Sequence, residues 1–106
     1  MLNIEDIQDM LEETELEVVY DHFPEEEVPD LPFLVWFEAE TENYGADNKV
    51  YQDRHDVRVE FYSKFRDIGL ESDIEELFDT YGIFWNKEIA FLDDEQCYMT
   101  IYYLEV

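Results

Sequence analysis

The sequence predicts an α+β domain, in which a mostly antiparallel β-sheet carries two helices packed on one face. Two amphipathic helical segments, at 3–14 and 72–81, are separated by runs with the alternating apolar pattern of strands. The predicted order α-β-β-β-α-β-β is typical of helices gathered on one side of an antiparallel sheet. The 106 residues suffice for one core and contain no repeat or linker, so we expect a single domain spanning 1–106.

The first helix is predicted over residues 3–14. Ile4, Ile7 and Leu11 recur at helical spacing, while five acidic side chains face away from them: Glu5, Asp6, Asp9, Glu12 and Glu13. A short strand is expected to follow at 16–20, where apolar residues cluster without helical spacing.

A long hairpin is predicted in the middle of the chain. All three prolines fall within 22–32, which predicts an extended loop before the hairpin. The segment 33–40 alternates as a strand, and a second strand is expected at about 50–64. The turn-forming residues of 41–48 predict a polar tip between the two strands.

The second helix is predicted to begin at Ser72. Ser72 and Glu75 match the capping box, in which each side chain accepts a hydrogen bond from a backbone N–H of the other residue. Apolar residues continue at helical spacing to Tyr81, and Gly82 is expected to end the helix, because glycine adopts the left-handed conformation at little cost.

Two further strands are predicted at about 83–92 and 97–106, joined by the polar turn 93–96. The last strand is apolar on both faces. We therefore expect it to be covered on both sides, by the helices on one face and by a neighbouring subunit as one candidate for the other.

The net charge is −24, from 30 acidic and six basic residues. This balance argues against direct nucleic-acid binding, which requires basic side chains, and against an anionic membrane surface. Three explanations of the negative charge remain. The surface binds a basic protein partner, it mimics or repels DNA, or the protein is adapted to high salt. The longest apolar stretch, 31–37, is too short to span a membrane, and the N-terminus lacks a signal sequence, so synthesis in the cytoplasm is expected.

The sequence predicts no catalytic site, no metal site and no cofactor, and therefore not an enzyme. His22 and His55 do not have zinc-ligand spacing with Cys97, which is expected to be a buried thiol. The acidic run 93–95 lacks the glycine and the alternating ligands of a calcium loop. The three glycines are isolated, so no phosphate-binding loop is present.

The 18 aromatic residues exceed what a core of this size needs, which favours binding to other proteins. Trp36 shares its predicted strand face with acidic residues, as interface anchors often do. Polar tips on rigid sheets commonly reach a neighbour, so the hairpin tip is the first candidate interface and the acidic loop the second. The candidate interface residues are Trp36, Tyr44, Asp47, Tyr51, Arg54, Glu25, Glu26 and Glu27.

Several motifs occur in a fixed order: LPFLVW at 31–36, NYGADNKVY at 43–51, VRVEFYSK at 57–64, DIEELF at 73–78 and EQCYMTIYYLEV at 95–106. In these motifs and in its length, the chain resembles the small tail terminator proteins of long-tailed phages of Gram-positive bacteria. These proteins are also described as head–tail joining or minor tail proteins. The resemblance covers nearly the whole chain.

The resemblance implies a structural protein of the virion, assembled in the host cytoplasm and located at the head–tail junction. Its implied partners are further copies of itself in a homohexameric ring, the tail tube protein and the head connector or head-closure protein. Genomic DNA would pass through the ring without specific binding, and the resemblance implies no catalytic residues and no membrane.

Two other functions fit the sequence. One is an acidic DNA mimic that inhibits a host nuclease or restriction system, since such proteins are also small, acidic and rich in aromatic residues. The other is a different adaptor of the head–tail junction, for example a head-closure protein.

Overall fold

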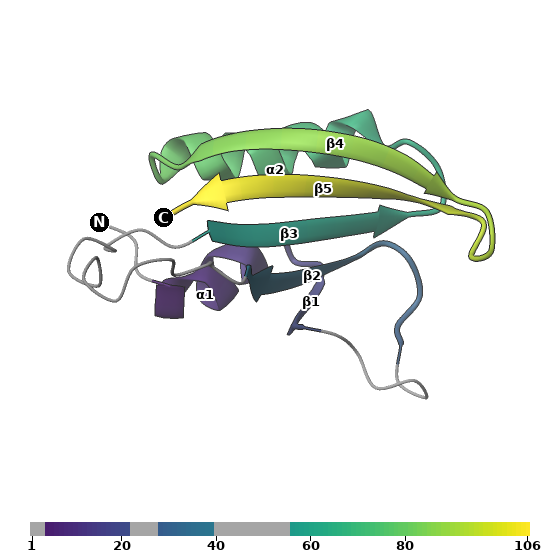
Figure 1. Ribbon diagram of the computed structural model, residues 1–106, viewed down its shortest axis with the longest axis horizontal. Coiled ribbons are helices and arrows are strands. Elements are labelled where there is room, and N and C mark those ends of the chain that lie inside the picture. The colour runs from purple at the N-terminus through teal and green to yellow at the C-terminus, as the bar shows by residue number, and fades with distance from the viewer. Residues whose placement is uncertain (1–3, 22–27, 40–55) are drawn as a thin grey trace, which may run out of the picture.

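The computed structural model describes residues 4–21, 28–39 and 56–106 (Figure 1). The elements are a 3-10 turn Ile4–Asp6, α1 Ile7–Glu12, β1 Glu17–Tyr20, β2 Phe33–Glu38, β3 Asp56–Ser63, α2 Ile68–Thr80, β4 Phe84–Leu92 and β5 Cys97–Glu105. The predicted α+β class and the order α-β-β-β-α-β-β are confirmed.

The five strands form one mixed sheet in the order β1-β2-β3-β5-β4. The pairings β2–β3, β3–β5 and β5–β4 are antiparallel, and β1 runs parallel to β2. The sheet is therefore mostly antiparallel, as predicted. In the described part of the chain, β1 and β4 each pair with one strand and form the two edges of the sheet.

One hydrophobic core joins both helices to a single face of the sheet. Its residues alternate along the strands: Val57 faces the same side as Val59, and Leu104 and Tyr102 are their partners on β5. The buried cluster comprises Ile7, Met10, Leu11, Leu34, Trp36, Val57, Val59, Phe61, Ile74, Phe78, Ile83, Tyr102 and Leu104. Among the described residues, no helix covers the opposite face of the sheet.

The first helix is shorter than predicted, because residues 4–6 form a 3-10 turn and α1 ends at Glu12. Its end is fixed by Thr14, whose Oγ1 donates to the Leu11 carbonyl at 2.7 Å and accepts from the Leu16 N–H at 3.2 Å. Between Thr14 and Leu16, Glu15 adopts φ 68°, a left-handed backbone conformation that residues other than glycine rarely adopt. The chain thus reverses from α1 into β1 through a strained acidic residue.

The second helix begins at Ile68, so the predicted start at Ser72 is wrong. Asp67 is the N-cap, and its Oδ1 accepts a hydrogen bond from the Leu70 N–H at 3.0 Å. Ser72 lies inside the helix and is exposed. The predicted end is confirmed, since α2 ends at Thr80 and Gly82 adopts φ 72° directly after the C-cap Tyr81.

The predicted strands at 16–20, 83–92 and 97–106 are confirmed as β1, β4 and β5. The predicted strands at 33–40 and 50–64 correspond to β2 and β3 over their described residues. The predicted polar tip at 41–48 lies outside the described residues.

The face of the sheet away from the helices, here called the open face, follows from the strand register. It includes Phe33, Val35 and Phe37 of β2, Arg58, Glu60 and Tyr62 of β3, Met99, Ile101 and Tyr103 of β5, and Asn86, Glu88 and Ala90 of β4. On β5 these residues are half-buried, whereas Tyr102 and Leu104 on the helical face are almost fully buried.

Candidate functional site

Trp36 is the one predicted interface residue within the described ranges, and the structure places it in the core. It is 7% exposed, its Nε1 donates to Gln8 Oε1 at 2.6 Å, and its ring lies 4.8 Å from that of Tyr20. The expectation that Trp36 lies on a polar face is wrong because β2 is an inner strand, and Trp36 shares its helical face with Leu34.

The other predicted interface residues lie outside the described residues. They are Tyr44, Asp47, Tyr51 and Arg54 of the predicted tip, and Glu25, Glu26 and Glu27 of the acidic loop. The roles assigned to them stay predictions, as does the absence of a zinc role for His22 and His55.

The described residues offer little for catalysis. Within 4–21, 28–39 and 56–106, no group of three or more His, Cys, Asp and Glu side chains is arranged to hold a metal ion. Cys97 is buried, as expected, and burial together with the nearby Glu95 raises the pKa of its thiol, which makes it a weak nucleophile. No helix in the described part of the chain is long and apolar enough to cross a membrane.

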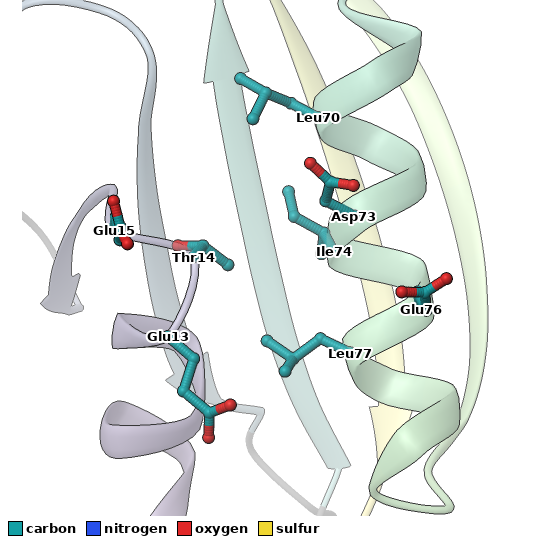
Figure 2. A pocket seen from close by; sticks show the side chains of 8 residues that line it. All are labelled: Glu13, Thr14, Glu15, Leu70, Asp73, Ile74, Glu76 and Leu77. Atoms are coloured by element: carbon teal, nitrogen blue, oxygen red, sulfur yellow. The ribbon is translucent and has the colours of Figure 1, made fainter.

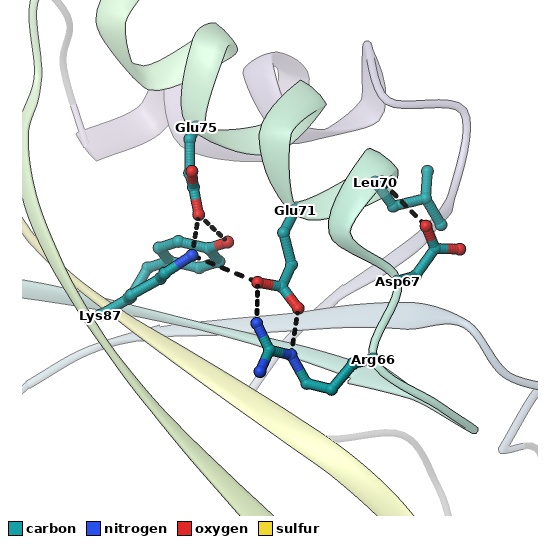
Figure 3. Close-up of polar contacts among 7 residues, drawn as sticks. Arg66, Asp67, Leu70, Glu71, Glu75 and Lys87 are labelled. Atoms are coloured by element: carbon teal, nitrogen blue, oxygen red, sulfur yellow. Dashed lines mark hydrogen bonds and ion pairs between the residues drawn. The ribbon is translucent and has the colours of Figure 1, made fainter.

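A charged cluster ties α2 to the sheet (Figure 3). The Glu71 side chain is 2% exposed, and its oxygens accept hydrogen bonds from Arg66 Nε at 2.9 Å and from Lys87 Nζ at 3.2 Å. Lys87 Nζ also lies 2.6 Å from Glu75 Oε2, which in turn accepts from the Tyr102 hydroxyl at 2.9 Å. A buried carboxylate is stable only when it is paired in this way.

The titration of this cluster follows from its contacts. Burial alone would raise the pKa of Glu71, but the hydrogen bonds and charges of Arg66 and Lys87 outweigh burial and lower it. The hydrogen bond to Glu75 raises the pKa of Lys87. Glu71 and Lys87 are therefore both charged at neutral pH, and their contacts hold α2 against the sheet.

Edge strand β4 is the longer of the two sheet edges and exposes large apolar side chains. It spans nine residues, against four in β1. Phe84 is 70% exposed and Phe91 is 45% exposed. An exposed strand edge carries backbone N–H and C=O groups that can pair with a strand of another chain. The sequence does not identify either phenylalanine as exposed, because the apolar pattern of β4 does not show that this strand is an edge.

The open face combines aromatic rings with charge. The Arg58 guanidinium lies 4.6 Å from the centre of the Tyr103 ring, and the Tyr103 hydroxyl donates to Glu88 at 2.6 Å. The Phe33 and Tyr62 rings lie 5.1 Å apart. Aromatic residues and arginine are enriched at protein–protein interfaces.

A third surface is the groove between α1 and α2, here called the helical groove (Figure 2). It is lined by Glu13, Thr14 and Glu15 on one side and by Leu70, Asp73, Ile74, Glu76 and Leu77 of α2 on the other. Its volume is 260 Å³, below the roughly 300–1,000 Å³ of small-molecule sites. The groove therefore suits part of a polypeptide better than a cofactor.

No protein-family model matches this chain, and no curated protein sequence matches it.

Proposed function

We propose that this chain is a structural protein of a phage virion, a tail terminator that forms a ring on the end of the tail tube and joins the tail to the head connector. The motifs at 31–36, 43–51, 57–64, 73–78 and 95–106 support this proposal through their resemblance to tail terminators. The domain also has surfaces through which subunits of such a ring could contact one another.

The observation that carries the proposal is the pair of unlike sheet edges, β1 and β4. When one edge of a subunit contacts a different edge of the next, the contact is head-to-tail, and such contacts generate a ring when the rotation between neighbours closes. Edge β4, with its exposed Phe84 and Phe91, offers both backbone pairing groups and apolar area for this contact. Edge β1 presents Tyr20, which is 54% exposed.

The negative charge has a use in a ring through which DNA passes. Each of six copies would bring −24, and an acidic channel wall repels phosphate, so that moving DNA does not adhere to it. In this proposal the partners are other copies of the chain, the tail tube protein and the head connector or head-closure protein, and the protein resides at the head–tail junction and has no enzymatic activity.

The experiment is electron microscopy of a lysate from the phage that carries this gene after the gene has been deleted. A tail terminator stops tube growth and allows head attachment. The expected result is filled heads beside separate, abnormally long tails. Tails of normal length, or normally joined particles, would contradict the proposal.

A DNA mimic is the second candidate, and one observation favours it. The helical side of the molecule exposes Glu13, Glu15, Asp73 and Glu76, which together form an anionic surface. If the chain is a mimic, the deletion yields normally joined particles, and the phage fails only in hosts that carry a DNA-targeting defence.

A further inference from the structure

We infer that the helical groove binds a basic, amphipathic segment of a partner protein, with apolar residues on its floor and lysine or arginine heads at its acidic rim. The inference concerns the helical side of the molecule and does not depend on the ring, whose proposed contacts use the edges of the sheet.

The floor of the groove is apolar. Leu70, Ile74 and Leu77 follow one another at helical spacing and point from α2 toward α1, while Thr14 points toward them from the other side (Figure 2). Ile74 is fully buried and belongs to the core, whereas Leu70 and Leu77 are half-buried at the core's margin. A partner's apolar side chain that covered these two leucines would extend the core outward.

The rim of the groove is acidic on both sides. Glu13 and Glu15 come from the end of α1 and the turn after it, and Asp73 and Glu76 come from α2. All four side chains are exposed. Lysine and arginine place their aliphatic stems on apolar surface and their charged heads in water, so this floor and rim match both parts of a basic side chain.

The two flanks of α2 differ in how their charge is neutralised. On the flank toward β4, Glu71 and Glu75 are paired with Arg66 and Lys87. On the flank toward α1, the ion pairs found among the described residues include none of the groove carboxylates. Like charges held together without a counter-ion repel one another, and a cationic partner removes that repulsion.

A hydrogen bond within the chain fixes the two sides of the groove relative to each other. The Tyr81 hydroxyl, just after α2, donates to the Glu13 carboxylate just after α1. The groove therefore exists before a partner arrives, which lowers the entropic cost of binding.

The test titrates the full chain with a synthetic amphipathic peptide of lysine and leucine, at about 0.3 M salt, where interactions between distant charges are screened. A lysine–serine peptide of the same length and charge is the comparison. We expect the lysine–leucine peptide to bind at least about tenfold more tightly, because the apolar floor contributes only to that complex. Amide NMR shifts should locate it at Leu70–Leu77.

Two charge-matched triple variants separate the groove from general attraction to an acidic protein. The groove variant carries Glu15→Gln, Asp73→Asn and Glu76→Gln, and we expect it to bind the lysine–leucine peptide about tenfold more weakly. The control variant removes the same number of charges from the exposed 93–96 turn, through Asp93→Asn, Asp94→Asn and Glu95→Gln, and should lose less than about twofold.

Three results would overturn the inference. They are equal losses in the two triple variants, equal affinity for the two peptides, and NMR shifts confined to the sheet. Each would show that the peptide responds to net charge or to another surface. None of them bears on whether the chain terminates tails, since that is read from the deletion phenotype.

Discussion

Arg66 Nε lies 2.9 Å from Glu71 Oε2, although the Glu71 side chain is only 2% exposed. Together with Lys87 on β4, this pair fixes the first turns of α2 to the far edge of the sheet. Leaving a buried charge without its partner is strongly destabilising, so removal of either partner should destabilise the domain.

The first prediction is that Glu71→Gln lowers the free energy of unfolding by about 2 kcal/mol at pH 7, because the three hydrogen bonds from Arg66 and Lys87 lose their anionic acceptor. The loss should depend on pH. The pKa of Glu71 is lowered from 4.5 in the folded state, so its stabilisation is present above about pH 4.5 and is lost as the pH falls through the lowered value. Urea unfolding of both proteins from pH 7 to about pH 3 measures this.

The difference between the two proteins isolates Glu71, because the other carboxylates titrate in both of them. Glu76→Gln, on an exposed position of the same helix, is the control and should show no such pH-dependent difference. If the Glu71→Gln difference stayed constant down to pH 3, the charged pairing of Glu71 would not be a source of stability.

A second prediction concerns the stability of the domain at alkaline pH. Burial, followed by the hydrogen bond to Glu75, raises the pKa of Tyr102 above its ordinary value of 10. A group whose folded pKa is raised stabilises the fold below its unfolded pKa, and this contribution is lost as the pH rises further. Tyr102→Phe should therefore cost about 1 kcal/mol at pH 8 and reduce the decline in stability above pH 10.

Thermal or urea unfolding between about pH 8 and pH 11 checks this prediction. Tyr20→Phe changes the same atom on a side chain that is 54% exposed, and should leave the alkaline decline unchanged. An unaltered decline in Tyr102→Phe would contradict the assignment of the decline to Tyr102.

The third prediction tests where α2 begins. Asp67→Ala removes the oxygen that accepts from the Leu70 N–H at 3.0 Å and should cost about 1 kcal/mol. Ser72→Ala changes an exposed position inside the helix, where alanine has the better helix propensity, so it should be neutral or stabilising by a few tenths of a kcal/mol. If denaturant unfolding showed a larger loss of stability in Ser72→Ala than in Asp67→Ala, the helix would begin at the predicted capping box of Ser72.

The start of α2 shows why the local sequence pattern predicts the order of the elements but not the residue at which this helix begins. Ser72 and Glu75 match a capping box, and Gly69 weakens the helical tendency of the residues before them. Glu71 outweighs both signals, because its contacts with Arg66 and Lys87 hold residues 68–71 against the sheet. One of those partners is 16 residues further along the chain, and no local window includes it.

The surfaces were harder to predict than the elements. The sequence pattern places Trp36 on a polar face because period-2 alternation assumes that one face of a strand is polar, whereas β2 buries both Leu34 and Val35. The helical groove joins Glu13 and Glu15 to α2, which lies more than 50 residues away in the sequence. The spacing of residues in the sequence therefore does not predict the helical groove. The order of the elements is predictable because it depends only on local periodicity.

The fourth prediction concerns edge β4. Phe84 is 70% exposed, so Phe84→Ser should change the free energy of unfolding by less than about 0.5 kcal/mol. If β4 is a subunit contact, the variant supplied from a plasmid should restore far fewer joined particles to the gene-deleted phage than the unmodified chain does. Phe65→Ser removes an equally exposed ring, 66% accessible, outside the strand edges and is the matched control. Equal rescue by both variants would show that Phe84 of β4 is not part of a subunit interface.

The fifth prediction uses two residues in the left-handed conformation. Glu15 has φ 68°, so Glu15→Gly should stabilise the domain by about 1 kcal/mol by relieving backbone strain. Gly82 has φ 72° and no atom within 4 Å of where a Cβ would lie, so Gly82→Ala should lose about 1 kcal/mol from the backbone alone. Denaturant unfolding measures both changes, and a loss in Glu15→Gly would show that its side chain stabilises the fold.

A stabilising Glu15→Gly would bear directly on the helical groove. An acidic residue that weakens the fold is kept for some other property, and Glu15 lies on the rim where a cationic partner is proposed. Glu15→Gly should therefore be more stable and yet bind the lysine–leucine peptide more weakly. Gln96→Gly, at φ 53° in the β4–β5 turn, relieves similar strain away from the groove and should leave peptide binding unchanged. If Glu15→Gly bound the peptide as tightly as the unmodified chain, Glu15 would not be part of the binding rim.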